Sequence, residues 1–309
     1  MTTLDGVLFF PITPFGRDGS LDLCALREHL EQGLAAGPGG VFVACGTGEF
    51  HALSPAEHRQ VVETAVQVTG GLIPVYVGTG GPLPLAVELA RSAEECGADG
   101  LLLLPPYLAN APAAGLVAYT REVAAASDLP LIVYNRGTAR YDPAAAVAVS
   151  QIPIVTGFKD GIGDLDLLSR IVLAVRDALD GSGKPFQFFN GMPTAEVTVP
   201  AYRGIGVALY SSAVFCFAPE ISLAFYEAVA EGNTALADRF LAEFFHPLVA
   251  LRDEVPGYAV SLVKAAVTLR GLDVGGVRAP LLDPEPAHLA RLGAILEAGL
   301  ALTTTRSAA

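Results

Sequence analysis

Two kinds of hydrophobic pattern alternate along this chain. Short, almost wholly apolar runs that end at glycine, proline or polar residues are typical of strands buried on both faces. Between them, apolar residues recur every three or four positions, as Leu23, Leu26, Leu30 and Leu34 do, and this spacing predicts amphipathic helices. The eight strand-like runs are residues 7–15, 40–45, 74–77, 100–104, 130–134, 154–159, 186–190 and 206–210.

Strand-then-helix units of this kind predict a parallel sheet covered by helices. Eight of them within residues 1–231 predict an α/β fold, a closed (β/α)8 TIM barrel, with a doubly wound open sheet as the alternative. One helix is expected to begin at Ser54-Pro55, because Glu57 stands in the position of a capping box.

After the eighth strand-like run the pattern is purely helical. The predicted helices there are residues 219–231, 234–252, 258–269 and 286–302. We therefore expect a catalytic barrel in residues 1–231, a C-terminal helical extension in residues 232–302 packed on the barrel, and a disordered tail in residues 303–309. The apolar faces of the extension need cover from the barrel or from another subunit, so oligomer contacts are expected there or on the barrel flank.

Composition and charge narrow the class of protein. The chain has 309 residues, is 52% hydrophobic and carries a formal charge of −13, which argues against nucleic-acid binding. Its longest uncharged run, 100–120, contains Pro105, Pro106 and Pro112 and is not expected to cross a membrane. The first residues lack the basic segment of a signal peptide, so a cytoplasmic protein is expected. The four scattered cysteines and the five histidines show no metal-ligand spacing, so no metal is expected.

The residues that close each strand-like run are the candidates for chemistry, because active sites of such barrels lie at the carboxyl ends of the strands. Lys159 ends the sixth run, between Gly157 and Gly161. Burial lowers a lysine's pKa, and a neutral amine attacks carbonyl groups. The alternative is a solvated lysine paired with Asp160. Tyr134, one strand away, is placed to carry protons for a buried Lys159, although it is otherwise a core aromatic residue.

Other strand ends offer groups for binding an anion. The turn Gly46-Thr47-Gly48 presents backbone N–H groups and a hydroxyl that suit a carboxylate. Glu49, which follows, is expected to orient this turn. Further candidates for substrate binding are Arg136, Asn190, Ser211 and Ser212. For Arg136 the alternative is an ion pair on the barrel rim, and for the serines it is the satisfaction of backbone groups at a strand end.

Three motifs in this order resemble the dihydrodipicolinate synthase and N-acetylneuraminate lyase superfamily of class I Schiff-base barrels over nearly the whole chain. They are the turn at 46–49, similar to the family's GTTGE, the pair Tyr134-Asn135, and the segment 157–160 (GFKD). The resemblance implies that Lys159 forms a Schiff base with a 2-oxo acid, that Tyr134 is the acid/base, and that Gly46, Thr47 and Gly48 bind the α-carboxylate. It also implies no cofactor and a homotetramer or homodimer.

Within this superfamily the segments GTGEF, YNR, GFKDGIGD and YSSAVFCFAPE resemble most closely the 5-dehydro-4-deoxyglucarate dehydratases. That branch converts a 2-oxo sugar diacid of glucarate and galactarate catabolism to 2,5-dioxopentanoate, water and carbon dioxide. Leu108 stands where the synthases have a second tyrosine, so their proton relay is expected to be absent. The alternatives are a pyruvate-dependent aldolase or synthase of the same superfamily and, of a different class, a non-catalytic sugar-acid-binding regulator.

Overall fold

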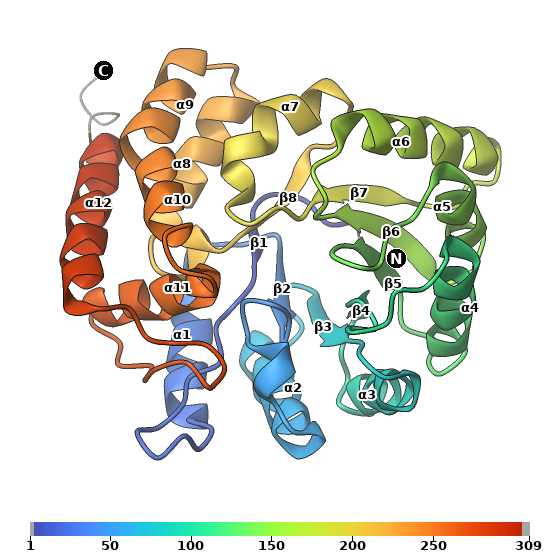
Figure 1. Ribbon diagram of the computed structural model, residues 1–309, viewed down its shortest axis with the longest axis horizontal. Coiled ribbons are helices and arrows are strands. Elements are labelled where there is room, and N and C mark those ends of the chain that lie inside the picture. Colours follow the sequence, from blue (N-terminus) through green and yellow to red (C-terminus); the bar gives the residue numbers. More distant parts are fainter. Residues whose placement is uncertain (1–2, 305–309) are drawn as a thin grey trace.

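The chain folds as a closed barrel of eight parallel strands, in the order of the sequence (Figure 1). The computed structural model describes residues 3–304. The prediction of a closed barrel rather than an open sheet is confirmed, because β1 pairs with both β2 and β8. The strands are β1 (Leu8–Phe9), β2 (Gly40–Val43), β3 (Val75–Thr79), β4 (Gly100–Leu103), β5 (Leu131–Asn135), β6 (Val155–Asp160), β7 (Gln187–Asn190) and β8 (Leu209–Ser212).

Successive residues of each strand face opposite sides of the barrel wall. Val41 and Val43 belong to the large cluster of buried residues between the strands and the helices. Phe42 lies between them in sequence but belongs to a second cluster, where its ring stacks 4.5 Å from that of Phe10 and 4.9 Å from that of Tyr76. This alternation decides which strand-end residues face the inside of the barrel.

Helices surround the strands, as the periodicity predicts (Figure 1). The capping box of Ser54 and Glu57 is present at the start of α2. The helices up to the eighth strand–helix unit are α1 (Leu23–Ala35), α2 (Pro55–Thr69), α3 (Leu83–Glu95), α4 (Ala113–Ala124), α5 (Pro143–Ser150), α6 (Leu165–Leu179), α7 (Val199–Gly204) and α8 (Pro219–Ala230), with the short helices η1 (Phe50–Ala52), η2 (Ala195–Thr198) and η3 (Val214–Cys216).

The predicted helix 234–252 is divided by a π-helical segment. It consists of α9 (Thr234–Phe240), the π segment η4 (Leu241–Phe245) and α10 (His246–Arg252). Pro247 stands at the start of α10 and has no backbone N–H, so the regular helical hydrogen bonds cannot continue through this point. The last two helices are α11 (Tyr258–Leu269) and α12 (Pro286–Thr304).

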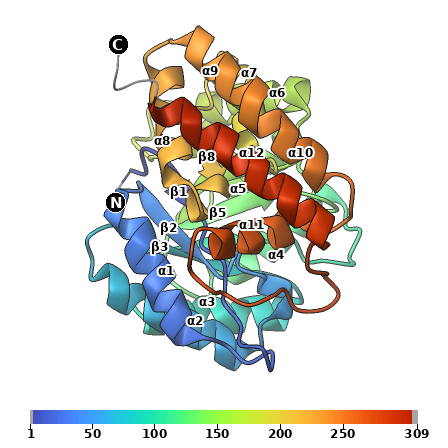
Figure 2. The same cartoon turned by 90° about the vertical axis from the view of Figure 1, so that its left-hand side faces the viewer.

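The C-terminal helices gather on one side of the barrel (Figure 2). There α12 packs against α8, η4, α10 and α11. The approach is close at Gly299, where an added Cβ would lie 2.4 Å from a Phe244 ring atom. The predicted boundary at residue 231 falls in the turn between α8 and α9. Of the tail predicted to be disordered, Thr303 and Thr304 are helical because α12 continues through them, and 305–309 lie outside the described residues. Among residues 3–304, no helix has both the length and the apolar character that a membrane crossing needs.

Candidate active site

A pocket opens at the carboxyl ends of the strands and is bounded on one side by the C-terminal helices. Most of its polar lining comes from strand ends and the loops after them: Gly46, Thr47, Tyr107, Tyr134, Arg136, Lys159, Thr194 and Ser211. Its apolar lining includes Leu248 of α10 and Leu262 and Val263 of α11. The site therefore has a polar floor at the barrel and an apolar wall from the extension, an arrangement common in small-molecule sites.

Lys159 faces the inside of the barrel. It lies opposite Tyr134 in the pairing of β5 with β6, and only 5% of its surface is exposed. Its Nζ lies 4.0 Å from the ring centroid of Phe10 and 4.7 Å from that of Tyr134. No carboxylate of residues 3–304 forms an ion pair with it. The pKa of Lys159 is lowered to about 7, chiefly by burial; the nearby Cys45 opposes this shift and the charge of Arg136 adds to it.

The alternative in which Lys159 pairs with Asp160 does not hold in the structure. Asp160 faces the opposite side of the strand, where its oxygens accept hydrogen bonds from Asn135 Nδ2 at 2.7 Å and Tyr202 Oη at 2.6 Å. The backbone N–H of Gly163 also donates to it. Asp160 thus stabilises the neighbouring strand ends and leaves the amine of Lys159 without a counter-charge.

Tyr134 lies in contact with both Lys159 and Arg136. Its hydroxyl donates to the carbonyl oxygen of Gly191 at 2.7 Å and accepts from Arg136 Nη1 at 3.1 Å. Burial raises the pKa of Tyr134, while the Arg136 charge and hydrogen bond act in the other direction. Arg136 has no acidic partner within residues 3–304, so the rim ion pair considered as its alternative is not present. A phenol beside a cation and a buried amine is suited to proton transfer.

Gly191 is required by the close packing of these groups. A Cβ at this position would lie 2.6 Å from Lys159 Cε and 2.8 Å from Tyr134 Cε2. Such distances are far inside van der Waals contact, so the backbone of the loop after β7 can approach the lysine only because residue 191 lacks a side chain.

The turn at residues 46–49 divides into a part that faces the pocket and a part that anchors it. Gly46 and Thr47 line the pocket. Gly48 does not, and its carbonyl accepts a hydrogen bond from Thr13 Oγ1 at 2.7 Å. Glu49 is fully buried with a left-handed backbone (φ 54°), and its carboxylate is held by Lys264 and by the backbone N–H of Arg278. Glu49 therefore lies behind the turn, as expected for a residue that orients it.

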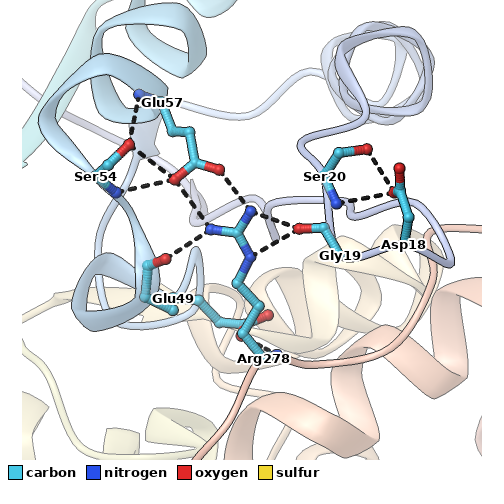
Figure 3. A network of polar contacts seen from close by, with 8 residues as sticks. Asp18, Gly19, Ser20, Glu49, Ser54, Glu57 and Arg278 are labelled. Carbon is cyan, nitrogen blue, oxygen red and sulfur yellow. Dashed lines mark hydrogen bonds and ion pairs between the residues drawn. The ribbon is translucent and has the colours of Figure 1, made fainter.

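Arg278 extends this anchor to two other segments (Figure 3). Its guanidinium binds both carboxylate oxygens of Glu57 and the carbonyls of Gly19 and Ala52. The Glu57 carboxylate also accepts hydrogen bonds from Ser54 at the start of α2. These contacts connect three segments beside the turn: the start of α2, the loop after β1 and the loop before α12 (Figure 3).

Ser211 lines the pocket, but Ser212 and Asn190 do not. Ser212 Oγ donates to Glu196 Oε1 at 2.5 Å on the other side of β8. The amide of Asn190 donates to Ala195 O and Thr198 Oγ1. Gly48, Asn190 and Ser212 thus lie outside the pocket lining, because strand alternation or internal hydrogen bonds direct them elsewhere, and their role in substrate binding stays a prediction.

The sequence analysis missed the lining residues that do not follow a strand. Arg252 from α10 and Tyr258 from α11 line the pocket, and no strand-end pattern could have marked them. Tyr107 also lines it, whereas Leu108, whose backbone is left-handed (φ 62°), points fully into solvent. Within residues 3–304, no group of three or more metal-ligating side chains is placed to hold a metal ion.

Comparisons with known proteins agree with this geometry. The model of the dihydrodipicolinate synthetase family matches residues 3–299. A protein of Streptomyces griseus subsp. griseus named "Probable 5-dehydro-4-deoxyglucarate dehydratase" is 54% identical and covers 98% of this chain and 94% of its own. One with the same name from Paracidovorax citrulli is 41% identical over 94% of each chain. The crystal structure of dihydrodipicolinate synthase from Oceanobacillus iheyensis superposes with a TM-score of 0.87 at 26% identity, covering 95% of this chain and 96% of that one. The resemblance found in the sequence is thus confirmed, and the chain belongs to the dihydrodipicolinate synthetase family.

Proposed function

We propose that this protein is a hydro-lyase that converts 5-dehydro-4-deoxyglucarate to 2,5-dioxopentanoate, carbon dioxide and water through a Schiff base on Lys159. The observation that carries the proposal is the amine of Lys159, buried in the pocket without a carboxylate partner and with its pKa lowered to about 7. Such an amine is substantially neutral near pH 7 and therefore nucleophilic. The names of relatives at 52–54% identity support the choice of substrate.

The first half of the reaction is a dehydration. The Lys159 amine adds to the C5 ketone, and one water leaves to give an iminium ion. The iminium draws electrons from C4, so a C4 proton is lost and the C3 hydroxyl departs as water. The result is a C3=C4 double bond conjugated with the imine. Tyr134 carries protons at the imine, because its ring centroid lies 4.7 Å from Lys159 Nζ and its hydroxyl accepts a hydrogen bond from Arg136, whose charge partly offsets the effect of burial on the pKa of Tyr134.

The second half is a decarboxylation that uses the same electron sink. The electron pair of the C1–C2 bond moves through the conjugated system to the imine nitrogen as carbon dioxide leaves. Protonation of the resulting dienamine and addition of one water to the C5=N bond release 2,5-dioxopentanoate and regenerate the lysine. One amine thus serves both steps, and the proposal includes no cofactor.

The α-carboxylate at C6 is assigned to the turn after β2. Gly46 and Thr47 offer backbone N–H groups and a hydroxyl at the pocket, and Ser211 adds a second hydroxyl. The cytoplasmic location and the homotetramer or homodimer expected from the sequence belong to the proposal as well. Sedimentation equilibrium of the purified protein tests the assembly.

The principal test is reduction of the protein with borohydride in the presence of 5-dehydro-4-deoxyglucarate, with an unreduced sample assayed for carbon dioxide. We expect a mass adduct on the peptide that contains Lys159, together with gas release, and neither in Lys159→Met. An adduct without carbon dioxide would favour the pyruvate-dependent aldolase or synthase. No adduct with this substrate or with pyruvate would overturn the Schiff-base mechanism and favour the sugar-acid-binding regulator.

A further inference from the structure

Two arginines line the pocket, and they differ in what already holds them. Arg136 donates to the hydroxyl of Tyr134, so it belongs to the reacting centre. Arg252 comes from the end of α10, outside the barrel. The proposed substrate has a carboxylate at each end, and the turn after β2 accounts for only one of them. Arg252 is therefore a candidate for recognising the other carboxylate.

The loop after β7 holds the guanidinium of Arg252 at the pocket wall. Nη1 donates to the carbonyl oxygen of Pro193 and to Oγ1 of Thr194, both at 2.9 Å. Thr194 has a left-handed backbone (φ 52°), which is uncommon for a residue with a branched Cβ, and both loop residues also line the pocket. The Arg252 side chain is only 17% exposed. The guanidinium is therefore fixed in place before a ligand arrives.

The hydrogen-bonding capacity of Arg252 is only partly used. Nε donates to Asp253 Oδ1 at 2.8 Å, while Nη2 has no hydrogen-bond partner in residues 3–304. Asp253 is 61% exposed, so water screens its charge more than that of the arginine. The neighbouring wall is apolar, with Leu248 and Leu262. A held cation with a free donor beside an apolar wall favours an anionic oxygen.

We propose that Arg252 binds the distal carboxylate of the substrate and so selects 2-oxo diacids over 2-oxo monoacids; this inference rests on the proposed function. With the α-carboxylate at Gly46 and Thr47 and the ketone at Lys159, the remaining carbons extend from the strand ends into the part of the pocket that the C-terminal helices and the loop after β7 enclose. The distal carboxylate is the group that leaves as carbon dioxide.

This role predicts a particular kinetic effect. The contact with Arg252 exists while the carboxylate is charged and weakens as neutral carbon dioxide forms. The contact therefore contributes to binding and not to the decarboxylation step. Loss of the guanidinium in Arg252→Gln is expected to raise KM for 5-dehydro-4-deoxyglucarate by about 10- to 100-fold, the usual size of a charge-assisted hydrogen bond, with a smaller change in kcat.

The deciding experiment compares two acids that differ only at the far end. 2-Oxoadipate and 2-oxohexanoate both offer a ketone next to a carboxylate on six carbons, and only the first is a diacid. Borohydride trapping on Lys159, followed by intact mass, gives the half-saturating concentration of each. We expect the wild type to favour 2-oxoadipate. Arg252→Gln should lose that preference by about 10-fold or more while its trapping of 2-oxohexanoate changes little.

Three further variants test whether the effect of Arg252→Gln is specific to the guanidinium. Arg252→Lys keeps the charge and should retain part of the preference, and Thr194→Val, which removes one contact to the guanidinium, should weaken it less than Arg252→Gln does. Arg270→Gln, which breaks an exposed pair with Glu220, is the matched control and should leave both acids unaffected.

Two results would overturn the inference about Arg252, and a third would overturn the proposed function instead. Equal weakening of both acids in Arg252→Gln would show a structural role only. Loss of the diacid preference in Arg136→Gln but not in Arg252→Gln would transfer the role to Arg136. A wild type that favours 2-oxoadipate but does not turn over 5-dehydro-4-deoxyglucarate would overturn the proposed function and leave Arg252 as a diacid-binding residue.

Discussion

Lys264 Nζ lies 2.8 Å from Glu49 Oε1, and both side chains are almost completely buried. Lys264 belongs to α11 in the C-terminal extension, whereas Glu49 closes the turn that presents Thr47 to the pocket. Lys264 also donates to Gly276 O at 2.6 Å and lies 4.2 Å from the ring centroid of Phe15. The extension thus holds the back of the turn to which the α-carboxylate is assigned.

Removing one member of this pair leaves the other charge buried and unpaired. Lys264→Met is therefore expected to lower the free energy of unfolding by about 3–5 kcal/mol, measured by urea denaturation. It should also raise KM for 2-oxo acids, since the turn loses its anchor. As a comparison, Arg59→Ala breaks two ion pairs in which both partners are well exposed, and it should cost less than about 1 kcal/mol. Equal effects of the two substitutions would contradict the role of the buried pair.

The lowered pKa of Lys159 predicts how adduct formation depends on pH. Only the neutral amine attacks a ketone, and burial in the pocket favours that form. The initial rate of borohydride trapping with pyruvate should rise about tenfold per pH unit below pH 7 and level off above about pH 7, since the pKa is about 7 instead of 10.5. A rate that keeps rising to pH 10 would show a lysine with an ordinary pKa.

Tyr134 is expected to act in proton transfer and not in binding. Tyr134→Phe retains the ring beside Lys159 but removes the hydroxyl that contacts Gly191 O and Arg136. It should lower kcat by about 10²- to 10⁴-fold while the protein still traps pyruvate at saturation. Stopped-flow measurement of turnover beside the trapping yield separates the two effects. An unchanged kcat would remove Tyr134 from the mechanism.

The packing at Gly191 can be tested by adding a single methyl group. In Gly191→Ala the added methyl group would meet Lys159 and Tyr134 at less than 3 Å. We expect a loss of about 1–3 kcal/mol in the free energy of unfolding and a marked loss of trapping on Lys159. The matched control is Gly204→Ala at the end of α7, where a Cβ meets nothing within 4 Å, and it should be neutral or slightly stabilising.

The sequence predicted the barrel because parallel strands buried on both faces have a distinct pattern. Each of the eight strands overlaps a predicted run and extends beyond it by two residues at most. Lys159 and Tyr134 face the pocket. The differences between the expectations and the structure have physical causes. Ser211 and Ser212 are adjacent, and only the structure could tell which of them faces inward. The predicted helix 234–252 forms two helices with a π segment between them, because Pro247 interrupts the regular hydrogen bonds. Arg252 comes to the pocket through tertiary packing that no local pattern of residues records.

Glu196 carries a last prediction, which concerns stability rather than catalysis. Its side chain is fully buried behind β8, where Ser212 donates to one carboxyl oxygen and the other has no partner in residues 3–304. Burial raises the pKa of Glu196 from 4.5 to about 7, and the Ser212 hydrogen bond only partly opposes this. The protonated carboxyl is thus the form that the fold favours.

The sign of the pH dependence follows from this shift. Between about pH 4.5 and 7 the folded protein holds a proton on Glu196 that the unfolded chain has lost, so its contribution to stability is complete below pH 4.5 and declines as the pH rises through 7. A shift of this size corresponds to roughly 3 kcal/mol. Glu196→Gln keeps the shape of the neutral carboxyl and should remove this decline. In urea denaturation the variant and the wild type should be nearly equal at pH 4.5, and the variant should be more stable at pH 8. Parallel curves for the two proteins across this range would mean that Glu196 is charged in the folded state.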